Sequence, residues 1–397
     1  MANIIENKAK PKRISDAELK RRWKAVRENM KERNLDFLIF QNSSPILPGN
    51  VKWFTDISFR GFAQPITVIF PREDEMTIIK NALRPAREEL SSPELRGVKK
   101  QIMVPMFWTS LTPSITLDAE KTVAELSKFK NCRIGWVGLG YLPAAFYKYV
   151  TEHLPGAKFE DATDLIDYLK AIKSDEEISL IRETCELEDK IFEYILTIVH
   201  TGESDVVIKN KILEKCALWG AEPNIGIRTA PAGTSPKPPP DNTPRILENG
   251  DQLTFLIETS SPTDYWGELS RTICIGSVTS ELQEQFELAK EAQQATLNLL
   301  RPGTSVADFW EVNNTFMRKH GYPEENRLYA HGQGYDMVER PCLDPDEPWK
   351  IESRMFLAVH PEVKSNQAFG WVCDNYLVKE SGKPEHFHKT PQKIFVV

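Results

Sequence analysis

Apolar and polar residues follow strand-like and helix-like patterns in turn along the first 160 residues. The segment 15–34 opens with the capping box Ser15-Asp-Ala-Glu18 and continues with apolar residues at helical spacing, which predicts a helix. Strands are predicted at 37–40, 66–70, 76–79 and 133–137, and helices at 118–129 and 142–153. Strands and helices that alternate in this way predict an α/β domain at residues 1–160.

The pattern changes after residue 160, and a second domain is predicted at 161–397. Helices are predicted up to Gly202 and at 206–219, 281–300 and 306–320, and strands at 253–257, 272–275, 355–359, 371–379 and 394–397. The segment 230–241 holds five of the 27 prolines, which predicts a loop or extended coil. The expected fold is α+β, with an antiparallel sheet covered by helices.

Composition narrows the possible partners. The chain has 397 residues and a net charge of −7, which disfavours a nucleic-acid binder. No apolar run approaches the roughly 20 residues that span a bilayer, and the N-terminus has no secretory pattern, so we expect no membrane partner. Six cysteines without paired short spacing indicate reduced thiols. We therefore expect a cytoplasmic protein.

Five ionisable residues stand within or beside apolar strand sequence, where a charge is costly unless a partner or ligand is present. Two are carboxylates near the predicted hairpin, one is an imidazole that opens His-Gly-Gln-Gly-Tyr, and two stand in or after the last apolar strands. They are Glu258, Glu268, His331, His360 and Asp374. Such a set suits a hard or borderline divalent metal, and equally acid–base catalysis.

The order of these residues resembles the pita-bread superfamily of methionine aminopeptidase, aminopeptidase P, prolidase and creatinase. The segment 171–181 is similar to that family's entry into its catalytic domain. Peptidase members bind two metals through Asp, Asp, His, Glu and Glu in chain order. The resemblance places the first four positions on Glu258, Glu268, His331 and His360, and the fifth on Cys373 with Asp374 beside it.

The departures from that family indicate a different chemistry. Peptidase members also use two auxiliary histidines, and these positions fall within 238–241 and on Val338, where this chain has no histidine. The changed ligands predict the loss of the dinuclear centre. The resemblance to creatinase-like and ectoine-hydrolase-like members then implies a hydrolase that cleaves a C–N bond in a small polar, amino-acid-like substrate.

Two mechanisms stay open at this point. In the first, the site holds no metal, Glu258 activates water or attacks directly, His331 or His360 moves the proton, and Glu268 holds a cationic part of the substrate. In the second, His331, His360 and a carboxylate hold a single divalent metal, Mn, Fe or Zn, for hydrolysis or elimination. A Xaa-Pro dipeptidase with remodelled ligands and a non-catalytic binding domain are the further alternatives.

Four residues are candidates for contact with the substrate. Arg60 could grip a carboxylate, because in creatinase-like dimers this stretch reaches the neighbouring subunit's site. Tyr335 lies close in sequence to His331 and could pack over a cation. Arg271 and Glu339 are expected to orient Glu268 and the loop that follows His331. The resemblance also implies a homodimer.

Overall fold

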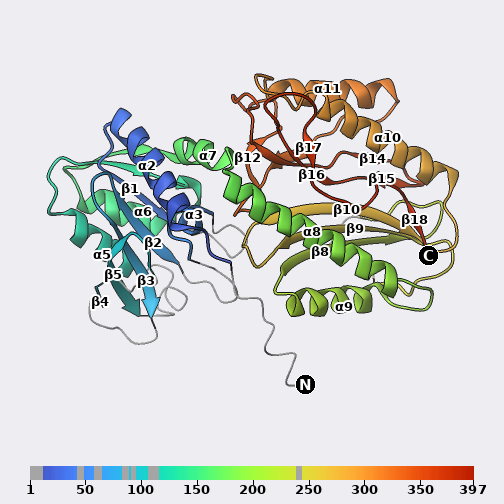
Figure 1. The fold of residues 1–397 in the computed structure, drawn as a ribbon, viewed down its shortest axis with the longest axis horizontal. Coiled ribbons are helices and arrows are strands. Elements are labelled where there is room, and N and C mark those ends of the chain that lie inside the picture. The colour runs from blue at the N-terminus through green and yellow to red at the C-terminus, as the bar shows by residue number, and fades with distance from the viewer. Residues whose placement is uncertain are drawn as a thin grey trace. The chain divides into compact units, whose positions relative to one another are not determined.

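The structure is a computed structural model, and it describes residues 12–42, 49–57, 65–82, 89–90, 95–105, 116–237 and 244–397. Its described residues form two compact units, Arg13–Lys170 and, with Lys12, Ala171–Val397 (Figure 1). No helix among the described residues is both long and apolar enough to cross a membrane.

The N-terminal unit is built on a seven-stranded mixed sheet in the order β4-β5-β3-β2-β1-β6-β7. Its strands are β1 (Phe37–Gln41), β2 (Ile66–Pro71), β3 (Met76–Ala82), β4 (Glu89–Leu90), β5 (Val98–Pro105), β6 (Arg133–Trp136) and β7 (Lys158–Asp161). Its helices are α2 (Asp16–Glu32), α3 (Gly49–Thr55), α5 (Leu117–Leu126), α6 (Ala144–His153) and α7 (Thr163–Ala171).

The N-terminal unit follows its sequence pattern closely. The hydroxyl of Ser15 accepts from the backbone N–H of Glu18, so the predicted cap begins α2. Strand β1 is buried along its whole length between an antiparallel neighbour, β2, and a parallel one, β6. This burial on both faces explains why its sequence is a continuous apolar run. The α/β fold expected for this part of the chain is confirmed.

In its described residues, the C-terminal unit combines four helices with three antiparallel or mixed sheets. The sheets have the orders β18-β10-β9-β8, β12-β11-β13-β16-β17 and β14-β15. The helices are α8 (Asp175–Ile198), α9 (Asp205–Leu218), α10 (Ser280–Leu297) and α11 (Ala307–Lys319). The first sheet comprises β8 (Glu222–Ala230), β9 (Gln252–Ser260), β10 (Trp266–Cys274) and β18 (Phe395–Val396). The others comprise β11 (Ala330–Gly332), β12 (Glu339–Cys342), β13 (Phe356–Val359), β14 (Glu362–Lys364), β15 (Phe369–Trp371), β16 (Asp374–Leu377) and β17 (Glu385–His386).

Helices α8 and α9 cover one face of the first sheet, and α10 and α11 lie on the other side of the unit (Figure 1). Leu253, Phe255 and Ile257 of β9 pack with apolar residues of the two covering helices. Because side chains alternate along a strand, the even-numbered residues of β9 and β10 face away from α8. Glu258 and Glu268, which pair directly across the two strands, therefore share the inner face.

The second sheet meets the first where β10 approaches the residues before β16. The backbone N–H of Ser270 donates to the carbonyl of Cys373. In the second sheet His331 pairs with Ala358, and Ala358 pairs with Asn375. The same alternation puts the side chains of Cys373 and Asn375 on one face of β16 and that of Asp374 on the other.

Candidate active site

Glu268, His331 and His360 bring their side chains together inside the C-terminal unit. The Nε2 atom of His331 lies 3.5 Å from Oε2 of Glu268, and that of His360 lies 4.0 Å from Oε1. The two imidazole rings meet edge to face with centroids 5.2 Å apart. All three residues are buried. One carboxylate and two imidazoles within this distance form a candidate ligand set for a divalent metal.

Several atoms of this group have no hydrogen-bond partner among the described residues. They are Oε2 of Glu268 and both ring nitrogens of His360. His331 contacts the carbonyl of Gly332 through Nδ1 at 2.8 Å, and its Nε2 faces Oε2 of Glu268 at 3.5 Å. Buried polar atoms are costly without a partner, so these atoms indicate that a ligand binds between the three side chains.

Glu258 lies beside this group and differs from Glu268 in its protonation. Its Oε2 accepts from Nδ2 of Asn224 at 2.6 Å. Burial, together with repulsion from Glu268, raises the pKa of Glu258 to about 8. Burial opposes a charge on Glu268 as well, but His360 and His331 outweigh it and lower its pKa to about 2. Near neutral pH the pair therefore holds one proton, on Glu258.

The pKa values of the two histidines are also displaced in opposite directions. Burial lowers the pKa of His360 to about 4, so its imidazole is neutral and its lone pair is available. Burial also acts against a charge on His331, but the Glu268 carboxylate outweighs it and holds the pKa of His331 above its ordinary value.

Cys373, and not Asp374, faces this group. Its thiol donates to Oε1 of Glu268 at 3.2 Å, and burial raises the pKa of the thiol well above its ordinary value. Asp374 points the other way and forms a buried ion pair with Arg271, 2.6 Å between Nη2 and Oδ1. Although burial opposes it, Arg271 holds the pKa of Asp374 well below its usual range.

The other residues predicted from the sequence lie at varying distances from the group. Tyr335 is buried and stacks on Tyr265 with centroids 4.1 Å apart. Glu339 pairs with Lys173 at 2.8 Å and accepts from the backbone N–H of Asp336, so it supports the loop that follows His331. Arg60 and the segment 238–241 lie outside the described residues.

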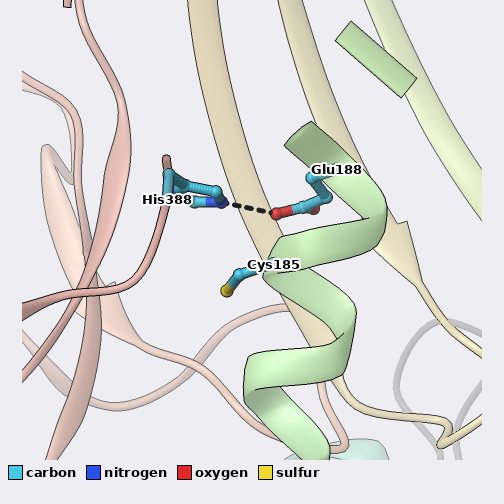
Figure 2. A group of neighbouring side chains, drawn as sticks. All are labelled: Cys185, Glu188 and His388. Carbon is cyan, nitrogen blue, oxygen red and sulfur yellow. Dashed lines mark hydrogen bonds and ion pairs between the residues drawn. The ribbon is translucent and has the colours of Figure 1, made fainter. Parts of the chain in front are cut away.

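A buried acid that the sequence did not reveal lies directly behind Glu258 and Glu268. Glu188 of α8 accepts from the backbone N–H of Thr259 at 3.2 Å and from Nε2 of His388 at 2.9 Å. Figure 2 shows Cys185 and Glu188 on the same side of α8, with the Glu188 carboxylate pointing to His388. Glu188 thus fixes the backbone beside Glu258 from the helix side.

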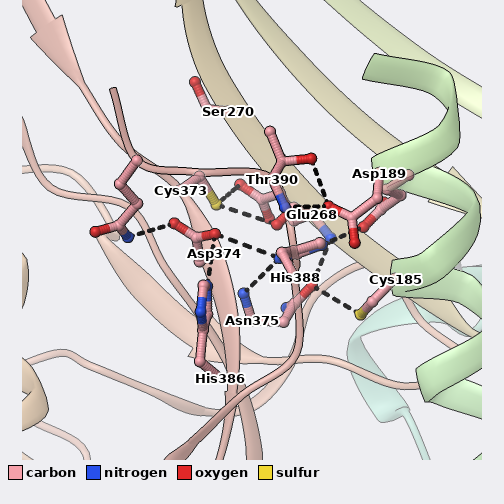
Figure 3. Close-up of polar contacts among 12 residues, drawn as sticks. Cys185, Asp189, Glu268, Ser270, Cys373, Asp374, Asn375, His386, His388 and Thr390 are labelled. Atoms are coloured by element: carbon pink, nitrogen blue, oxygen red, sulfur yellow. Dashed lines mark hydrogen bonds and ion pairs between the residues drawn. The ribbon is translucent and has the colours of Figure 1, made fainter. Parts of the chain in front are cut away.

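The contacts of His388 continue through Asn375 to the site itself (Figure 3). Its Nδ1 accepts from the backbone N–H of Asn375, whose Oδ1 accepts from the backbone N–H of Glu268 at 2.7 Å. The Nδ2 group of Asn375 donates to Gln333, two residues after His331. One hydrogen-bonded network therefore positions residues from the helix, both strands and the His331 loop.

Two further groups have metal-ligating side chains close together, Cys185 with Glu188 and His388, and Asp374 with His386 and His388. In both, the ligand atoms already contact protein partners. Asp374 binds Arg271 and His386, and Glu188 binds His388 and Thr259. Within the described part of the chain, the group of Glu268, His331 and His360 is the one that combines convergent ligand atoms with unpartnered ones.

Glu258 opens into a cleft of about 490 Å³. Asn224, Arg228, Leu256 and Trp371 are among its lining residues. A larger cavity of about 930 Å³ lies elsewhere in the same unit. Tyr376, His386 and His388 are among its lining residues, but Glu258, Glu268, His331 and His360 are not. The smaller cleft is therefore the candidate substrate site, since it alone of the two reaches Glu258.

A two-unit fold with a buried carboxylate and histidine group defines a member of the pita-bread superfamily. The chain belongs to metallopeptidase family M24, whose model matches residues 179–380, and the model of the creatinase/prolidase N-terminal domain matches residues 22–172. This confirms the resemblance and the fold class expected from the sequence. Membership of this family makes the chain a hydrolase of the class that acts on C–N bonds.

Individual relatives are distant. The chain is 24% identical over 256 residues to a Xaa-Pro dipeptidase of Pyrococcus horikoshii, which is 64% of this chain and 72% of the relative. The fold is similar to that of a Xaa-Pro dipeptidase from Bacillus anthracis, with a TM-score of 0.76, 18% identity and coverage of 96% and 100% of the two chains. It is also similar to zinc-substituted aminopeptidase P of E. coli, with a TM-score of 0.71, 16% identity and coverage of 95% and 96%.

Proposed function

We propose that the chain hydrolyses a C–N bond in a small polar, amino-acid-like substrate, with Glu258 as the acid–base group and a single divalent ion held by Glu268, His331 and His360. The observation that carries the proposal is the convergence of ligand atoms from these three residues, among them unpartnered atoms of Glu268 and His360, beside the protonated Glu258. The family match and the dipeptidase relatives support the reaction class.

The three residues fit a single ion by their chemistry. Two imidazole nitrogens and one ionised carboxylate suit Mn, Fe or Zn. The contact of His331 with the carbonyl of Gly332 fixes the ring orientation, as outer contacts of metal-ligating histidines commonly do. When bound, such an ion polarises the scissile carbonyl or amidine and lowers the pKa of a bound water.

Glu258 is suited to move a proton between water and the departing nitrogen. A pKa of about 8 lies near the working pH of most enzymes, where a group both accepts and donates readily. Asn224 holds its Oε2, and the carboxyl opens into the cleft. The ionised Glu268 keeps the proton on Glu258 in the resting state, because two adjacent carboxylates resist a second negative charge.

The side chains around the proposed ion site favour a single ion over the two ions that peptidase members bind. The position where peptidase members have the fifth ligand carries Cys373, whose thiol already donates to Glu268.

A second candidate, a hydrolase without metal, is favoured by one observation. The pKa values of Glu258 and Glu268 are displaced in opposite directions, which is how acid and base roles are divided in several metal-free active sites. In this version Glu258 activates water in the fraction of molecules in which it has lost its proton, while His331 shuttles the proton.

Metal analysis separates the two candidates. We expect protein purified without added metal to contain about one divalent ion per chain, and His360→Gln to lose it. His200→Gln, which changes an exposed histidine of the same unit, is the matched control and should keep the ion. Turnover that persists in chelated, metal-free protein would contradict the single ion and support the second candidate.

The substrate screen uses Xaa-Pro dipeptides, amidino acids, lactams and cyclic amidines. Glu258→Gln should abolish turnover of any substrate found, while the variant stays folded, because Gln keeps the side-chain oxygen that accepts from Asn224. Full activity of this variant would contradict both candidates.

A further inference from the structure

The cleft that starts at Glu258 ends at an arginine on the neighbouring strand. In β8, Asn224 pairs with Glu258 and Arg228 pairs with Thr254, so Asn224 and Arg228 share the face of the sheet that carries Glu258. Gly226 lies between them and, because it has no side chain, leaves the floor of the cleft open. A Cβ atom at Gly226 would meet only Leu256, at 3.4 Å. The cleft therefore connects the acid–base group with the Arg228 side chain.

The guanidinium of Arg228 is held by aromatic rings and not by a carboxylate. It lies over the rings of Phe369 and Trp371, at 5.0 Å and 4.8 Å from their centroids. The nearest carboxylate oxygen, on Glu362, is 4.0 Å away, beyond hydrogen-bond distance. Among the described residues no hydrogen bond occupies its N–H groups. Stacking orients the planar fork while leaving its donors available.

Trp371 links this cation to the catalytic group. Its Nε1 donates to the backbone carbonyl of His360 at 3.1 Å, so a single indole separates Arg228 from a residue of the proposed ion site. The other acid that lines this end, Asp205, already accepts from Thr229 and from the backbone N–H of Arg245. This end of the cleft is thus prepared for an anion.

We infer that Arg228 binds the carboxylate of the substrate and thereby selects N-substituted amino acids that carry a free carboxylate, with the scissile C–N bond placed near Glu258. The inference rests on the proposed function for the position of the reacting bond. The carboxylate would displace no hydrogen-bond partner of Arg228 among the described residues and would compete only with the ion pair to Glu362 at 4.0 Å. A bidentate pair with a planar guanidinium is strong and depends on its geometry.

Binding can be measured without turnover in the Glu258→Gln background. The probes are glycyl-L-proline, N-acetyl-L-alanine and creatine, each compared with its carboxamide by isothermal titration calorimetry. We expect at least one acid to bind about tenfold to a hundredfold more tightly than its amide, the range of a charge-assisted hydrogen-bonded pair. Adding Arg228→Gln should remove that preference and leave binding of the amide unchanged.

Two further variants sharpen the test. Arg228→Lys keeps the charge without the planar fork and should retain only part of the preference. Lys319→Met removes an exposed cation of α11 that does not line the cleft and should retain all of it. The inference would be overturned if the preference for the acid survived Arg228→Gln. It would also be overturned if none of the acids in the panel bound more tightly than its amide. Neither result depends on whether Glu258 is catalytic, which the activity of Glu258→Gln decides separately.

Discussion

Glu258 and Glu268 lie directly opposite one another on neighbouring strands, yet their pKa values are displaced in opposite directions. The difference follows from their neighbours. Glu268 faces His331 and His360. Glu258, in contrast, accepts a hydrogen bond from the neutral amide of Asn224. His331 lowers the pKa of both carboxylates, but on Glu258 burial and the repulsion from Glu268 outweigh it, so the pair holds a single proton.

This displaced pKa predicts how Glu258→Gln changes stability with pH. Between pH 4.5 and 8 the unfolded chain has released the Glu258 proton and the folded chain has kept it. The folded state then binds more protons, so the free energy of unfolding falls as the pH rises, by at most about 1.4 kcal/mol per pH unit. Gln does not titrate. In urea unfolding of metal-free protein, the variant should gain stability over the wild type from pH 5 to pH 8.

The control for this measurement is Glu291→Gln, which changes an exposed glutamate of α10 and should follow the wild type at every pH. A stability difference between Glu258→Gln and the wild type that stays constant from pH 5 to pH 8 would contradict the displaced pKa.

At the residue scale, the chain order of the acids and histidines pointed to Glu258, Glu268, His331 and His360; the structure places these side chains near one another, and their roles stay predictions. It could not decide between Cys373 and Asp374, because a shift of one residue in a strand reverses the face of every side chain. Glu188 and His388 carried no sequence signal, since they are 200 positions apart and meet only in the folded chain.

At the scale of elements, strand β8 was missing from the sequence prediction. Its sequence contains Pro223, Asn224 and Gly226, residues that are uncommon in strands and obscure its pattern. Pairing with β9 along its whole length overrides this weak propensity. The same residues serve the cleft, because Asn224 holds Glu258 and Gly226 leaves space.

The pairing of β9 and β10 depends on a second glycine, Gly267, where Glu188 packs against the strand. A Cβ atom there would lie 2.5 Å from Oε2 of Glu188, which His388 and the backbone of Thr259 hold in place. Gly267→Ala should therefore destabilise the chain by about 1–3 kcal/mol, as overpacking does, and lower the turnover of whichever substrate is found. Urea unfolding measures the first effect.

Two comparisons make this prediction specific. Gly226→Ala, on strand β8 at the far side of β9, meets its nearest atom at 3.4 Å and should cost much less stability. Combining Gly267→Ala with Glu188→Asp shortens the obstructing acid and should recover part of the loss. If Gly267→Ala were as stable as Gly226→Ala, Glu188 would not be held as tightly as its contacts indicate.

At the scale of the whole molecule, the chain divides after Lys170, whereas the sequence pattern suggested a boundary near residue 160. The ten residues between the two positions include most of α7. The sequence around this helix is typical of turns, so it did not indicate clearly where the first domain ends. Each unit has an apolar core of its own, formed around β1 and β6 in one and around α8, β9 and β10 in the other.

These separate cores predict that the fragment 171–397 folds alone and binds the proposed ion. The side chains of the site network, from Glu188 to His388, all belong to this unit, so its ligand geometry needs no residue from the other. In thermal melts, Mn or Zn at 100 times its dissociation constant should stabilise the fragment by about 2.7 kcal/mol, as it should the full chain. His360→Gln should abolish the effect in both, and fragment 13–170 should melt cooperatively without responding to the ion. A fragment 171–397 that stays unfolded, or folds without responding to the ion while the full chain responds, would show that the N-terminal unit completes the site.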